Sequence, residues 1–140
     1  MVELYTESTA GVSVASNADI NYTNGSSSNC CCCNDLVLPT STVHVCKPGL
    51  YRVSFNGVIG NTGTAAADIG VYLANNNATV AGTETVVSIP AASRANIAFE
   101  KIVRVRPSCK AINNDLQLST KISGDGAIVY LANLIVERVC

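Results

Sequence analysis

The chain of 140 residues is poor in charged and aromatic side chains. Asp, Glu, Lys and Arg make up 14% of it, aromatic residues make up 5%, and tryptophan is absent. The formal net charge is −1, and Lys and Arg form no run, so neither nucleic acid nor an anionic membrane is an expected partner. A surface with so little charge favours an oligomer, because subunit interfaces are depleted in charged residues.

Targeting and membrane segments are also missing. Met1–Tyr5 has neither the basic start nor the apolar stretch of a signal peptide. The longest apolar runs, Ala127–Ala132 and Leu134–Val136, have the length of a strand and are too short for a membrane span. We therefore expect synthesis in a cytoplasm, with a role elsewhere after assembly left open.

Residues for catalysis are scarce, and we expect neither an enzyme nor a bound cofactor. His44 is the only histidine, and no Gly-x-Ser-x-Gly elbow or Asp-x-Asp-x-Asp-Gly calcium loop occurs. His44 and Cys46 share one face of a predicted strand, as a His-Cys dyad would require. A histidine on a strand surface is the simpler interpretation, and we adopt it.

The chain has seven cysteines, an odd number, and four of them are adjacent. Adjacent thiols alternate sides of an extended chain, which fits poorly with the Cys-x-x-Cys spacing of metal sites. Disulfides within or between chains, thiols pooled on a metal by a trimer, and thiols without a role all remain open. The cluster comprises Cys30, Cys31, Cys32, Cys33, Cys46, Cys109 and Cys140.

Residues 46–59 carry the strongest pattern in the chain. Lys47-Pro48-Gly49 predicts a turn, and the residues after it alternate apolar and polar, as in a half-buried strand. A second long strand is predicted over Arg94–Arg106. The expected core positions are Tyr51, Val53, Phe55, Ile97 and Phe99.

Two residues break the alternation of Arg94–Arg106. Lys101 falls among the apolar positions and Ile102 among the polar ones. A β-bulge near 100–102, or a partner chain covering that face, would explain both. Glu100, Arg104 and Arg106 are expected to form a salt-bridged outer face, with a capsid contact as the alternative.

The closing strand, predicted over Ala127–Val139, is apolar on both faces, with only Asn133 interrupting over 128–136. A strand of this kind is buried on both sides. One side would pack on the core and the other would then meet another subunit. The candidate interface residues are Ile128, Tyr130, Ala132 and Leu134, or, on the opposite parity, Val129, Leu131 and Ile135.

No segment has a helical period, and eight to ten short strands separated by turns predict an antiparallel sandwich or jelly roll. The length suits one domain over residues 1–140. Within it, residues 1–35 are expected to hold short strands and the cysteine-rich loop, and residues 36–140 the core sandwich.

The segment Cys46-Lys-Pro-Gly-Leu-Tyr-Arg-Val-Ser-Phe resembles the signature of complement-type globular heads in the tumour-necrosis-factor-like superfamily. Gly49, Tyr51 and Phe55 match the signature, Val53 stands where the family has Phe, and the lead-in is one residue shorter. The closing strand resembles the family's last strand, which lies near the trimer axis. Residues 36–136 fit this layout.

The whole sequence is similar to a narrower group of short bacterial-virus proteins with a spore-filament relative. They share the Met-x-x-Leu-Tyr start, the cysteine clusters and an ending like Ala-x-Leu-x-Val-x-x-Val-Cys. The resemblance implies a homotrimeric jelly roll on a virion surface, a head fibre or capsid decoration subunit of a bacteriophage, made in the host cytoplasm and attached to other capsid proteins.

The alternative function is a carbohydrate- or receptor-binding module that contacts host surface glycans. Loops rich in Asn, Thr and Ser, at Asn61–Thr64 and Asn75–Thr79, are suited to sugar hydroxyls. Sugar sites also use aromatic platforms, and only Tyr72 and Tyr22 are candidates for one.

Overall fold

A computed structural model describes residues 1–27, 36–106 and 115–139, and within these ranges the chain is all-β with no helix. No helix in this part of the chain is long and apolar enough to cross a membrane. The ten strands are β1 (Val2–Val14), β2 (Asn24–Ser27), β3 (Thr42–Val45), β4 (Gly49–Asn61), β5 (Ala67–Asn75), β6 (Ala78–Thr79), β7 (Thr85–Ile89), β8 (Arg94–Val105), β9 (Leu116–Ser123) and β10 (Ala127–Arg138).

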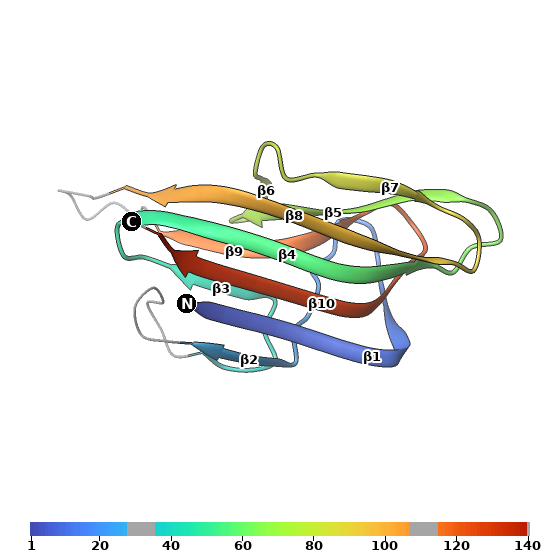
Figure 1. The fold of residues 1–140 in the computed structure, drawn as a ribbon, viewed down its shortest axis with the longest axis horizontal. Helices are drawn as coiled ribbons and strands as arrows, with labels where there is room; N and C mark the ends of the chain where they lie inside the picture. The colour runs from blue at the N-terminus through green and yellow to red at the C-terminus, as the bar shows by residue number, and fades with distance from the viewer. Residues whose placement is uncertain (28–35, 107–114, 140) are drawn as a thin grey trace.

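The strands form two antiparallel sheets packed face to face (Figure 1). Sheet A has the order β2-β1-β10-β4-β8 and lies in front in Figure 1. Sheet B, behind it, has the order β3-β9-β5-β6, with β7 also paired to β5. Successive strands from β7 to β10 alternate between the sheets, and the expected jelly roll is confirmed.

Strand β4 crosses the centre of the sandwich with its alternation intact. Tyr51, Val53 and Phe55 point inward and are at most 2% exposed, while Arg52 and Asn56 face solvent. Phe55 stacks on Phe99 of β8 with ring centroids 5.5 Å apart. Among the other expected core residues, Ile97 is fully buried and Phe99 is partly buried against the same core.

Strand β10 changes parity at Tyr130. Val129 pairs with Ile59 of β4 and Leu131 pairs with Val58, so Tyr130 is an extra residue on β10. This β-bulge shifts the alternation by one residue. We expected the interface residues of β10 to be alternate residues along the whole strand, and this is wrong. Ala132, Leu134 and Val129 lie inside the sandwich, and the residues on the outer face include both odd- and even-numbered positions.

Strand β8 has no bulge at residues 100–102, contrary to one of the two expected explanations. Its pairing with β4 continues unbroken from Arg94 to Val105. Lys101 points inward in register with Val53, and its amine lies beside Gly82, 3.3 Å from where a Cβ of that residue would stand. Ile102 points outward and is 45% exposed. The long aliphatic stem of lysine is what allows a charged residue at an inward position.

The N-terminal region contributes one long strand, where the sequence predicted two short ones. Residues 2–7 and 12–14 of β1 both pair with β10, and the register shifts between them. Between the two paired segments, four residues of β1 (Ser8–Gly11) thus lie opposite a single residue of β10, Tyr130. Strand β1 lies inside sheet A, between β2 and β10, so the sandwich begins well before residue 36.

Candidate functional site

The outer face of sheet A turns away from sheet B and carries a group of apolar side chains. Pairing and burial place residues from four strands on it. Tyr5 on β1 and Ile102 on β8 are 43% and 45% exposed. The remaining apolar members are half-buried: Val58 on β4, and Ile128, Tyr130, Leu131 and Ile135 on β10.

Two glycines make room for the Tyr130 ring on this face. A Cβ at Gly60 would lie 2.7 Å from the Tyr130 ring, and one at Gly11 would lie 3.0 Å from it and 2.5 Å from Ile128. The guanidinium carbon of Arg94 stacks 3.6 Å above the ring centroid, within the range of a cation–π contact. The ring is therefore held between the sheet and an arginine.

A hollow of about 250 Å³ opens beside Tyr130. It forms where β1 shifts its register, and the Ser8 hydroxyl there accepts a hydrogen bond from the Gly11 amide at 3.1 Å. Val58 and Leu131 supply an apolar floor, and Glu7 and Arg94 supply opposite charges at the rim. The full lining is Glu7, Ser8, Thr9, Val58, Arg94, Tyr130 and Leu131.

Asn133 lies near the middle of β10 on the same face. It pairs with Tyr5 of β1 and Asn56 of β4. Its Oδ1 is buried and accepts no hydrogen bond from any residue that the structure describes. Buried polar atoms in native proteins nearly always have a partner, so this oxygen is an exception among the described residues.

The charges on the outer face of sheet A are separated by strand. Glu3 and Glu7 project from β1, while Arg94 and Arg104 project from β8. Glu100 forms a salt bridge with Arg52 of β4 at 3.4 Å, between exposed side chains, whereas the sequence-based expectation paired it with Arg104 and Arg106. The face is thus acidic toward β1 and mainly basic toward β8.

The residues considered for catalysis and metal binding lie elsewhere. His44 Nε2 is within hydrogen-bond distance, 3.1 Å, of Asp115 Oδ2, a contact that was not foreseen from sequence. Cys46 is disulfide-bonded, and Cys30–Cys33, Cys109 and Cys140 lie outside the described residues. Across residues 1–27, 36–106 and 115–139, no three His, Cys, Asp or Glu side chains converge as a metal site would require.

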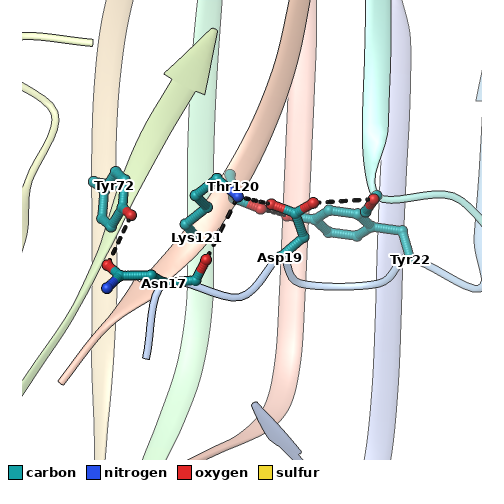
Figure 2. Close-up of polar contacts among 7 residues, drawn as sticks. Asn17, Asp19, Tyr22, Tyr72, Thr120 and Lys121 are labelled. Carbon is teal, nitrogen blue, oxygen red and sulfur yellow. Dashed lines mark hydrogen bonds and ion pairs between the residues drawn. The ribbon is translucent and has the colours of Figure 1, made fainter. Parts of the chain in front are cut away.

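The two tyrosines considered as sugar platforms are buried (Figure 2). The Tyr22 hydroxyl lies 2.6 Å from Thr120 Oγ1 inside the sandwich. Burial raises the pKa of Tyr22 far above its usual value, and the Thr120 hydrogen bond offsets this only in part. Tyr72 donates to Asn17 Oδ1 at 3.0 Å. Neither ring is available to stack on a ligand.

Next to Thr120, Lys121 points to the opposite side of sheet B. Its ammonium donates to Asp19 Oδ1 at 2.7 Å, and Ser41 donates to the other carboxylate oxygen at 3.4 Å (Figure 2). These bonds hold the segment after β1 against β9. Sequence analysis did not predict this network, because Asp19 and Ser41 lie in short segments without a clear alternation and meet Lys121 only through the fold.

The asparagine-rich loops use their amides internally. Asn61 is 3% exposed, donates to the carbonyls of Ala65 and Ile89, and accepts from the Gly63 amide. Asn75 Oδ1 accepts from the Gln117 amide at 3.0 Å. These two side chains shape their loops, which weakens the case for the loops as a sugar site.

No protein-family model matches the chain, and no curated protein matches its sequence. Solved structures with the same fold include the globular domain of zebrafish complement 1qA protein, at 7% identity and a TM-score of 0.53 over 99% of this chain and 97% of that one. Eiger TNF from S. frugiperda has 14% identity and a TM-score of 0.57, over 99% and 92%.

PRD1 vertex protein P5 has 18% identity and a TM-score of 0.50, over 99% of this chain and 96% of that one. At such identities the likeness concerns the fold alone. The expected resemblance to a tumour-necrosis-factor and complement-head jelly roll is thereby confirmed for the fold.

Proposed function

We propose that the protein is a structural subunit of a bacteriophage particle, a head fibre or capsid decoration protein, and that it assembles as a homotrimer through the outer face of sheet A. The observation that carries the proposal is the apolar centre of this face, formed by Leu131, Ile135 and their neighbours on β10. In a soluble chain, a contiguous apolar patch on a flat sheet indicates a protein contact.

The surrounding evidence fits a scaffold protein better than an enzyme. The chain has little charge, and one protein with the same fold, PRD1 P5, is a vertex protein. The sequence resemblance points to a virion surface as well. The proposal assigns the chain no catalytic step, and other capsid proteins are its expected partners.

Light scattering coupled to size exclusion, with and without reductant, tests the assembly. A mass of three chains under both conditions supports the trimer. Leu131→Glu should yield monomers, because it places a charge in the apolar centre of the face. Val86→Glu is the matched control, since Val86 is 45% exposed but lies on sheet B. A wild-type monomer would contradict the proposal.

The virion role needs its own experiment. Electron microscopy of particles from the lysate, with gold-labelled antibody against the chain, should show label on the particle surface. Label confined to the soluble fraction would overturn the virion assignment while leaving the trimer intact.

The hollow beside Tyr130 favours a second candidate function, binding of a host surface glycan. An apolar floor with a carboxylate and a guanidinium at its rim suits a sugar ring and its hydroxyls. A glycan array should show binding by wild type that is lost in Glu7→Gln. An array without any signal would leave only the structural role.

A further inference from the structure

Strand β8 is the long edge strand of sheet A. It pairs with β4 on one side, and no strand in the described part of the chain pairs with its other side. In Figure 1 it runs along the upper border of the front sheet. The opposite edge strand, β2, has only four residues, whereas β8 has twelve. A long unpaired edge is a template for another chain, and proteins protect such edges.

The hydrogen-bond pattern shows which backbone groups of β8 face the free edge. The Asn61 amide donates to the Ser93 carbonyl at 3.0 Å, where the contact of β4 with β8 begins. Successive residues of an antiparallel strand bond alternately to one side and to the other. Because the register then continues unbroken, the odd-numbered residues of β8 bond to β4. The even-numbered residues, from Arg94 to Arg104, direct their N–H and C=O groups to the free edge.

The side chains of these even-numbered residues would allow a second copy of β8 to pair there. All of them are exposed, and Ile102 is 45% exposed. In an antiparallel pair of two β8 strands centred on Ile102, Glu100 of each copy would lie opposite Arg104 of the other. Opposite charges in such positions stabilise a sheet. The outer side of the edge is therefore complementary to itself.

Lys101 is the exception, and it lies on the inward side of the strand. Its neighbours on that side, Phe99 and Val103, pack against the core. Its amine lies 3.3 Å from where a Cβ of Gly82 would stand, and Gly82 is exposed. The amine forms no hydrogen bond or ion pair with any residue that the structure describes. Water must then solvate the charge.

A second β8 strand would remove this water. In the pairing centred on Ile102, Lys101 would lie opposite Val103 of the second copy, between the two sheets of the enlarged sandwich. The lysine would lose solvent on its open side and gain an apolar neighbour without a counter-charge. Burying an unpaired charge in this way is unfavourable. An inward-pointing charge is one of the means by which proteins protect edge strands.

We infer that Lys101 prevents β8 of one copy from pairing with β8 of another. This role accounts for a charged residue at an apolar position of an unbroken strand, next to the exposed Ile102. The inference does not rest on the proposed trimer, because it concerns the backbone edge of sheet A, and each variant is compared with wild type whatever the number of subunits.

Light scattering coupled to size exclusion, at several protein concentrations, tests the inference. Lys101→Val removes the charge, so we expect a mass above that of wild type that rises with concentration. Lys101→Glu is the matched control: it keeps a charge at the inward position and should retain the wild-type mass. Circular dichroism verifies folding. If Lys101→Val does not fold, Lys101→Met, which keeps an unbranched stem without the charge, replaces it.

A second substitution locates the association. Ala98 directs its amide to the free edge, so Ala98→Pro removes a donor there and leaves the bonds to β4 in place. Lys101→Val/Ala98→Pro should return to the wild-type mass. If the proline variant does not fold, Ile102→Lys takes its place, because a lysine on an edge strand also disfavours pairing.

Three outcomes would overturn the inference. The first is a wild-type mass for folded Lys101→Val, or for Lys101→Met, at every concentration. The second is association of Lys101→Glu to the same extent, because the charge would then not matter. The third is association that persists with the second substitution, because another surface would then be responsible. None of these outcomes bears on the trimer, which the Leu131→Glu variant tests.

Discussion

The Tyr22 hydroxyl lies 2.6 Å from Thr120 Oγ1, which joins residues 98 positions apart inside the sandwich. Both side chains are fully buried. Tyr22→Phe leaves the Thr120 hydroxyl without this partner, so we expect the free energy of unfolding to fall by about 1–3 kcal/mol. Urea denaturation measures the loss, with Tyr5→Phe at an exposed position as a nearly neutral control.

A double variant separates the hydrogen bond from the packing. Tyr22→Phe/Thr120→Val removes both polar atoms and keeps the shape, so it should be more stable than Tyr22→Phe alone. Equal or lower stability of the double variant would show that the hydroxyl pair contributes little.

The raised pKa of Tyr22 predicts a loss of stability in alkali. Above the ordinary tyrosine pKa of 10.0, the unfolded chain releases the proton while buried Tyr22 retains it. Stability therefore falls as the pH rises beyond this value. The difference in free energy of unfolding between wild type and Tyr22→Phe should shrink by about 1.4 kcal/mol per pH unit there. A constant difference from pH 9 to pH 11 would contradict the prediction.

Two ion pairs with different burial should respond differently to loss of the carboxylate. The Lys121 side chain is 11% exposed and pairs with Asp19. Asp19→Ala should therefore lower the free energy of unfolding by about 1–3 kcal/mol or more. Arg52 and Glu100 are 45% and 61% exposed, so Glu100→Ala should cost less than about 1 kcal/mol. Thermal unfolding of both variants makes the comparison, and similar losses would refute it.

The space for the Tyr130 ring predicts a coupling with Gly60. Gly60→Ala places a methyl group 2.7 Å from the ring, and crowding of this size costs about 1–3 kcal/mol. Tyr130→Ala removes the nearer obstacle and leaves Ile128 Cγ2 at 2.9 Å, so Gly60→Ala should lower stability less in that background, though not to zero. Urea denaturation of wild type, the two single variants and the double variant gives the four free energies of unfolding of a double-mutant cycle. If the losses of the two single variants simply add in the double variant, the described packing of Tyr130 against Gly60 is contradicted.

Sequence alone predicted the features that depend on alternation. Tyr51, Val53 and Phe55 alternate with polar residues, and their inward positions follow from the pleat of a strand. The two-sided apolar character of β10 was also visible, as was Asn133 as its one interruption. These patterns depend only on neighbouring residues in the sequence, so they can be recognised without knowing which strands pair.

Features that depend on pairing escaped prediction. The bulge at Tyr130 is defined by the register between β10 and β4, and a continuous apolar run hides the change of parity. Lys101 suggested a bulge because it is a charged residue at an inward position of an unbroken strand, with its amine beside Gly82. Tyr22 lacked neighbours with a clear period. Tyr72 lies opposite in parity to Ile69, Val71 and Leu73, and its burial beside Asn17 became evident only in three dimensions.

The strand order of sheet A has a consequence for biosynthesis. Strand β10 leaves the ribosome after the other nine described strands, yet it lies between β1 and β4. Until residues 127–138 emerge, β1 has no place beside β4, and both present unpaired backbone edges. We expect nascent chains that end before Ala127 to need chaperone protection of these edges, and sheet A to be completed only when β10 emerges.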